Sequence, residues 1–76
     1  VRVSGYTDNV GAPAFNLVLS QRRARAIAEV LREQGVRDAQ LTVNGYGEDN
    51  PVASNATEAG RRLNRRVELL FTAEAP

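Results

Sequence analysis

Cysteine, histidine and lysine are all missing from these 76 residues. Without cysteine, neither the disulfide framework of a small secreted scaffold nor a thiolate metal site is available. Without histidine, the commonest general base and the commonest metal ligand are missing. An enzyme built on this chain would have to work with carboxylates or a hydroxyl, and nothing in the composition implies a metal ion or a cofactor.

The sequence also has neither a large excess of charge of one sign nor a long apolar run. Ten arginines face nine carboxylates, so the net charge is only +1. This balance does not by itself indicate a nucleic acid or an acidic membrane as the partner. The apolar runs are far shorter than the roughly 20 residues that span a bilayer. With 42 % hydrophobic residues, the composition is that of one small globular domain over residues 1–76.

Alternating apolar residues predict three strands. The segments are "VRVSGYTD" (1–8), "LTVNGYGE" (41–48) and "RRVELLF" (65–71). The first two segments echo each other, so we expect Asp8 and Glu48 to leave the sheet at the same edge. The tail "TAEAP" (72–76) is expected to fray.

Two helices are predicted between the strands. No glycine or proline interrupts the segment from 16 to 34, which is rich in good helix formers, and Gly35 then supplies a C-cap. We therefore expect a helix over about residues 15–34. A second, short helix is predicted over residues 58–63, with Thr57 or Asn55 as a candidate N-cap.

The order strand, helix, strand implies a crossover connection, so the first two strands are expected to be parallel. The predicted fold class is α/β, a two-layer sandwich of a mixed β-sheet with helices on one face.

One arginine of the long helix differs from the others. At about 100° per residue, Leu19, Ile27 and Val30 all fall within about 40° of Arg23. The wheel therefore places Arg23 in the middle of the apolar stripe that should face the sheet. The remaining helix arginines fall on the flank or the solvent side: Arg22, Arg25 and Arg32. A guanidinium on the core side must be paired or reach water, because a buried unpaired charge is costly.

Arg23 belongs to the N-terminal half of this helix, so it is expected near the carboxyl end of the first strand, where Asp8 leaves the sheet. Ligands of α/β folds usually bind at this end. Two interpretations remain open. Asp8 and Arg23 either form an ion pair that closes the loop, or are held apart to grip a zwitterion, with Asp8 taking an ammonium and Arg23 a carboxylate.

Five motifs follow one another in a fixed order: Gly5 to Asp8, Asn16, Leu19 to Ala24, Gly45 to Glu48, and Gly60 to Glu68. With "GYTD", "LSQRRA", "GYGE" and "GRRLNRRVE", the chain resembles the C-terminal peptidoglycan-binding domain of the OmpA/MotB/Pal type. Tyr6 stands where many members carry His. Family members also normally begin with a further strand and helix, so the resemblance implies an OmpA-like domain that lacks these two elements.

The resemblance implies noncovalent binding of peptidoglycan through the diaminopimelate of its stem peptide, and no enzymatic activity. Asp8 matches the aspartate that receives the amino group, and Arg23 matches the arginine that receives the carboxylate. Asn16 and Arg65 match supporting positions. Such a domain anchors a bacterial envelope protein to the cell wall at the periplasm or outer membrane, and the parent chain is expected to be membrane-associated. These residues contain no targeting segment of their own, and they predict no oligomeric state.

Three other functions are alternatives. The main one is a structural or interaction module with a closed Asp8–Arg23 ion pair. The cluster "RRLNRR" (61–66) suggests nucleic-acid binding, but no aromatic residue is interleaved and the net charge is low. Asp8 and Glu48 could imitate a glycosidase pair, but the charge of Arg23 would oppose protonation of Asp8.

Overall fold

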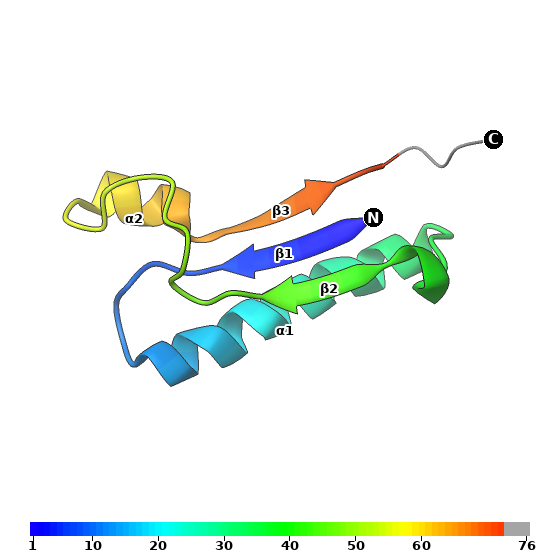
Figure 1. The fold of residues 1–76 in the computed structure, drawn as a ribbon, viewed down its shortest axis with the longest axis horizontal. Coiled ribbons are helices and arrows are strands. Elements are labelled where there is room, and N and C mark those ends of the chain that lie inside the picture. Colours follow the sequence, from blue (N-terminus) through cyan, green and yellow to red (C-terminus); the bar gives the residue numbers. More distant parts are fainter. Residues whose placement is uncertain (73–76) are drawn as a thin grey trace.

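The computed structural model describes residues 1–72. Of the tail that was predicted to fray (72–76), all residues except Thr72 lie outside the described residues. Strands and helices alternate along the chain (Figure 1). They are β1 (Arg2–Tyr6), α1 (Pro13–Glu33), β2 (Thr42–Gly45), α2 (Glu58–Asn64) and β3 (Arg66–Leu70), with a 3-10 turn (Asp38–Gln40) before β2. The predicted order and type of these five elements are confirmed, although α1 begins at Pro13 rather than at residue 15.

The three strands form one mixed sheet in the order β2-β1-β3. β1 is parallel to β2 and antiparallel to β3, which confirms the predicted α/β fold class. Gly5 pairs with Gly45, the same register that aligns the two echoing sequence segments. The backbone N–H of Thr7 donates to the carbonyl of Gly47 at 2.7 Å. The loops that follow β1 and β2 therefore start side by side, at the edge expected for Asp8 and Glu48.

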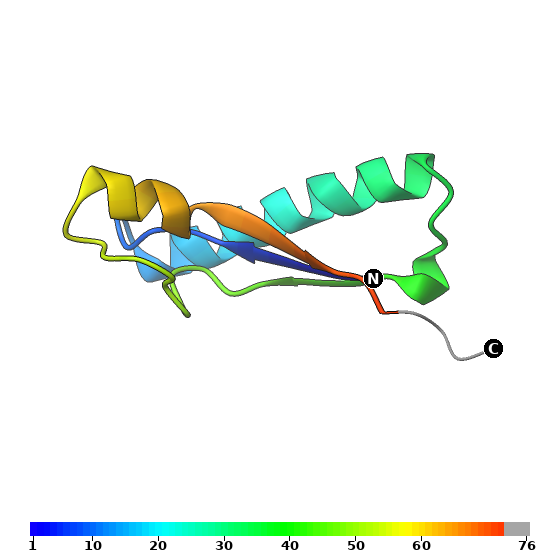
Figure 2. The same cartoon turned by 90° about the horizontal axis from the view of Figure 1, so that it is seen from above.

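The two helices have different places on this sheet. α1 lies across one face, mainly over β1 and β2 (Figure 2). α2 lies beyond the carboxyl ends of β1 and β2, next to the start of β3 (Figure 1). The layer that covers the sheet is thus α1, while α2 brings the residues just before β3 to the end of the sheet where Asp8 emerges.

Small side chains form the buried stripe of α1. They repeat every four residues: Asn16, Ser20, Ala24 and Ala28. On the strand side of this contact, a Cβ at Gly5 would overlap the carbonyl oxygen of Ser20, and a Cβ at Gly45 would overlap the backbone of Gln21. The helix backbone therefore lies directly on the two strands, and no large side chain fits between them.

The predicted place of Arg23 in the middle of the buried stripe is therefore wrong. The stripe is centred about 80° around the helix from Arg23, and Val30, expected near its middle, is 51 % exposed. Arg23 and Ile27 are half-buried at its edge. The physical reason is that close packing selects small residues for the contact, whereas a helical wheel gives most weight to large apolar ones.

Candidate functional site

Asp8 lies just after β1 and is almost buried, with 9 % of its side chain exposed. Its Oδ1 accepts the backbone N–H of Val10 at 3.0 Å, which folds the loop back onto the carboxylate. Its Oδ2 accepts a hydrogen bond from Nη1 of Arg65 at 3.2 Å. Both carboxylate oxygens therefore have partners in the structure. One partner is a backbone N–H of the loop, and the other is the long side chain of Arg65.

Asn16 holds the loop that carries Asp8. It is buried in the first turns of α1, with 3 % of its surface exposed. Its Nδ2 donates to the carbonyl of Val10 at 3.0 Å and to the carbonyl of Asp8 at 3.4 Å. The structure thus brings Asn16 and Asp8 together, with the amide of Asn16 turned toward the loop backbone.

Arg65 joins α2 to this site across 57 residues of sequence. Its Nη1 contacts Asp8 and its Nη2 donates to Oε1 of Glu58 at 2.7 Å. The hydrogen bond and charge of Glu58, followed by the charge of Asp8, raise the pKa of Arg65. In turn, hydrogen bonds from Arg65 and then from Arg61 lower the pKa of Glu58. Asp8, Arg65 and Glu58 therefore form one chain of alternating charges.

Arg23 has a different environment from the one expected for a closed ion pair. Within residues 1–72, no ion pair links Arg23 to Asp8, whose cationic partner is Arg65. Instead, Arg23 lines a pocket of about 420 Å³ between α1 and the start of β3. The other lining residues are Ala26, Ile27, Arg65, Arg66 and Val67.

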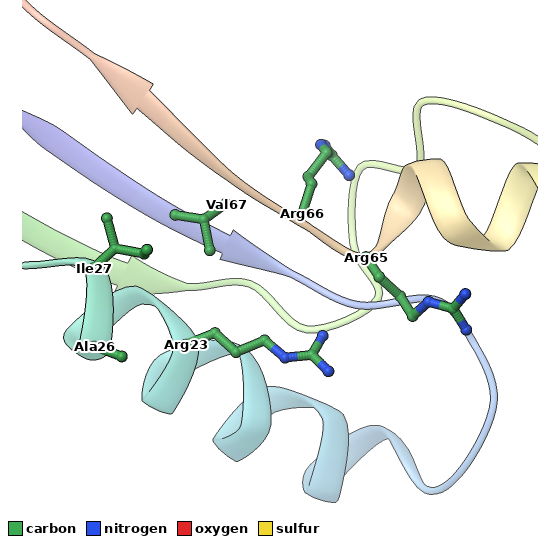
Figure 3. Close-up of a pocket in the computed structure, with 6 residues that line it drawn as sticks. All are labelled: Arg23, Ala26, Ile27, Arg65, Arg66 and Val67. Atoms are coloured by element: carbon green, nitrogen blue, oxygen red, sulfur yellow. The ribbon is translucent and has the colours of Figure 1, made fainter.

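The pocket combines two cations with an apolar wall. Figure 3 shows that the side chains of Arg23 and Arg65 extend in the same direction, toward the loop that leaves β1. Ile27 and Val67 face each other further along the pocket (Figure 3). Arg66 points away from α1 and lies over the ring of Tyr6, 3.9 Å from its centroid. Arg65 thus lines the pocket with Arg23 and also contacts the buried carboxylate of Asp8.

The tyrosines at the ends of β1 and β2 pack against each other. Tyr6 is buried and stacks on Tyr46, with ring centroids 5.4 Å apart. The site itself contains no metal-binding arrangement, since no group of three or more acidic side chains in residues 1–72 is placed to hold a metal ion.

Sequence reasoning missed two residues that shape the site, Glu58 and Asn64. Asn64 is completely buried. Its Oδ1 accepts the N–H groups of Val52 and Ala53, while its Nδ2 donates to Ala53 and Asn55. It thereby fixes the long loop to α2, immediately before Arg65. A low-propensity asparagine at the end of a helix was the available signal for Asn64. For Glu58 the signal was its spacing of three residues before Arg61 and of seven residues, about two helical turns, before Arg65.

Residues 1–65 match the family model described as the OmpA family. The chain belongs to the OmpA family. OmpA-like domains bind peptidoglycan and are not enzymes, which confirms the predicted class of a binding domain.

Two relatives of this OmpA-like domain are much longer proteins. It is 53 % identical over 75 residues to the outer membrane porin F of Pseudomonas fluorescens, covering 99 % of this chain and 23 % of the porin. It is 46 % identical over 70 residues to the peptidoglycan-binding protein ArfA of Mycobacterium bovis, covering 92 % of this chain and 22 % of ArfA. The chain therefore spans less than a quarter of either relative.

The fold also matches a known crystal structure. The crystal structure of the peptidoglycan-associated lipoprotein from Burkholderia pseudomallei superposes with a TM-score of 0.88 at 38 % identity. The match covers 93 % of this chain and 60 % of the lipoprotein chain.

Proposed function

We propose that this OmpA-like domain binds peptidoglycan noncovalently through the diaminopimelate of its stem peptide, and so anchors an envelope protein to the cell wall. The observation that supports this proposal is that Arg65 contacts the buried carboxylate of Asp8 and also lines a pocket with Arg23. In this assignment Asp8 receives the ammonium group and Arg23 the carboxylate. Asn16 holds the Asp8 loop, and Arg65 supports both charges.

The chemistry of the site suits a zwitterion with an aliphatic chain. Diaminopimelate carries an ammonium and a carboxylate on one carbon, next to a run of methylene groups. Charge-assisted hydrogen bonds are stronger than neutral ones, and low exposure strengthens them further. The apolar wall of Ala26, Ile27 and Val67 offers the methylene groups a surface away from water.

The arginine cluster at residues 61–66 argues against nucleic-acid binding. Arg61 pairs with Glu58, Arg65 with both Asp8 and Glu58, and Arg66 with Glu68. Most of the positive charge of the cluster is thus neutralised by neighbouring carboxylates, whereas binding to a phosphate backbone requires free cations.

The relatives suggest where the domain works. Porin F is an outer membrane protein by its name, and we infer that the present domain lies on the periplasmic side of the envelope as part of a membrane-associated chain. Neither of the helices described in residues 1–72 is long and apolar enough to cross a membrane.

Cosedimentation with purified peptidoglycan sacculi tests the proposal. Asp8→Asn and Arg23→Ala are each expected to weaken binding by about tenfold or more, because each leaves one ligand charge unpaired. Arg22→Ala is the matched control, since Arg22 is exposed on the same helix. Pelleting that is unchanged in both site variants would refute the assignment.

A longer chain should be tested beside this one. It would carry the additional strand and helix that the family resemblance implies, because the backbone of that segment normally contributes to the site. If the longer chain pellets and the present one does not, the site needs that segment. If neither pellets, the proposed function is wrong.

A further inference from the structure

The ammonium-binding carboxylate of the proposed site is already occupied by a cation of the protein itself. Oδ1 of Asp8 accepts the N–H of Val10 inside the loop, and Oδ2 accepts Arg65. Only 9 % of the Asp8 side chain is exposed. A ligand ammonium therefore has to take the place of Arg65 on Asp8. This exchange is easier when a second carboxylate keeps the displaced guanidinium paired.

We propose that Glu58 is the positioning residue that allows this exchange, by holding Arg65 while the ligand ammonium replaces it on Asp8. This inference rests on the proposed function. Arg65 lies 2.7 Å from Oε1 of Glu58 but 3.2 Å from Oδ2 of Asp8. Its two terminal nitrogens make these contacts separately, so Arg65 can leave Asp8 and keep Glu58.

Glu58 is itself held in place independently of Arg65. Its Oε2 accepts Nε of Arg61 at 3.2 Å, and Nη1 of Arg61 donates to the carbonyl of Asn55 at 3.0 Å. Glu58 also opens α2 directly after the N-cap Thr57, where the helix dipole favours a carboxylate. It therefore keeps its position when Arg65 moves.

The exchange leaves Arg65 where the ligand needs a cation. Tied to Glu58, Arg65 stays at the pocket that it shares with Arg23, so two guanidinium groups face the ligand carboxylate. Without Glu58, Arg65 would have Asp8 as its remaining carboxylate partner in residues 1–72 and would compete with the ammonium. Glu58 thus acts on ligand binding through Arg65.

Titration with meso-diaminopimelate, followed by amide NMR shifts such as that of Val10, tests this inference. Glu58→Gln is expected to raise the Kd about threefold or more, as befits a partly exposed ion pair. Arg65→Gln is also expected to weaken binding. The double variant should bind like Arg65→Gln alone, because Glu58 has no effect without Arg65. Glu29→Gln is the matched control, since Glu29 is exposed in a similar pair with Arg32 at 3.2 Å.

The outcomes separate this inference from the proposed function. A Kd of Glu58→Gln equal to that of the wild type would overturn the inference, and so would a double variant weaker than Arg65→Gln, which would point to a purely structural role in α2. Asp8→Asn in the same series reports on the site. If Asp8→Asn loses binding while Glu58→Gln does not, only the inference fails. If Asp8→Asn binds like the wild type, the proposed site fails and the inference with it.

Discussion

The two sides of α1 differ in how closely they meet the sheet. Over β1 and β2, the helix backbone lies on strand glycines, and its buried residues are small or polar. Toward β3, the same helix leaves a pocket of about 420 Å³ with Arg23 on its wall. A helix that is tightly seated along one side can carry charged side chains on the other without losing its position. Structural and binding roles are thus divided around one helix.

The side of α1 that packs on β1 and β2, here called the close side, should be the most sensitive to added volume. Gly5→Ala is expected to destabilise the domain by about 3 kcal/mol or more, because its Cβ would overlap the helix backbone at Ser20, which has no room to move away. Urea unfolding measures this change. In Gly35→Ala the added Cβ has no neighbour within 4 Å, and only the backbone strain at φ +100° remains, which costs about 1–2 kcal/mol. Equal losses in the two variants would contradict the close packing of α1.

Introducing leucine on each side of α1 compares the packing of the two sides directly. Ala24→Leu introduces a large side chain into the buried stripe, where Ala24 has no exposed surface, and should cost about 2–3 kcal/mol. Ile27→Leu conserves volume beside the open pocket and should cost less than about 1 kcal/mol. The two unfolding free energies would be measured by the same urea titration. Similar values would mean that the two sides are packed alike.

The loop on the pocket side depends on Asn64. Asn64→Ala removes the acceptor of the N–H groups of Val52 and Ala53 and the donor to Ala53 and Asn55. We expect a loss of about 2 kcal/mol in unfolding free energy, because these partly buried groups lose their partners. Asn44→Ala is the control, since Asn44 is exposed on β2. A loss no larger than that of the control would show that the loop is held by other contacts.

Much of the close side could be predicted from the sequence. The echo between residues 1–8 and 41–48 predicted that Asp8 and Glu48 leave the sheet at the same edge, and the observed register, with Gly5 opposite Gly45, agrees with it. The orientation of α1 could not be predicted in the same way. The wheel was weighted by Leu19, Ile27 and Val30, whereas the contact selects residues small enough to let two backbones approach.

On the pocket side, the sequence placed Asp8 and Arg23 at one end of the sheet but not the ion pair that forms there. Asp8 and Arg65 are 57 residues apart, and their contact depends on where α2 is held by its loop. No local pattern encodes that placement. The family resemblance singled out Arg65 as a supporting residue, but only the structure shows it on Asp8 and Glu58.

The smallest expected effect is the pH dependence of the Glu58 ion pairs. Because Arg65 and Arg61 lower the pKa of Glu58 from 4.5 in the folded state, the pairs stabilise the fold above pH 4.5. This stabilisation is lost as the pH falls through the lowered pKa, since protonation removes the charge of Glu58. The Tm of the wild type should therefore exceed that of Glu58→Gln at pH 7, and the difference should shrink as the pH falls below 4.5 and through the lowered pKa.

Glu33→Gln provides the control for this measurement. Glu33 is exposed at the end of α1 and forms no ion pair within residues 1–72, so its substitution should leave the Tm unchanged at both pH values. High salt should reduce the Glu58 difference at pH 7, because the pair is partly exposed and therefore screened. A Tm difference that persists at low pH would assign the role of Glu58 to uncharged contacts in the first turn of α2 and not to its charge.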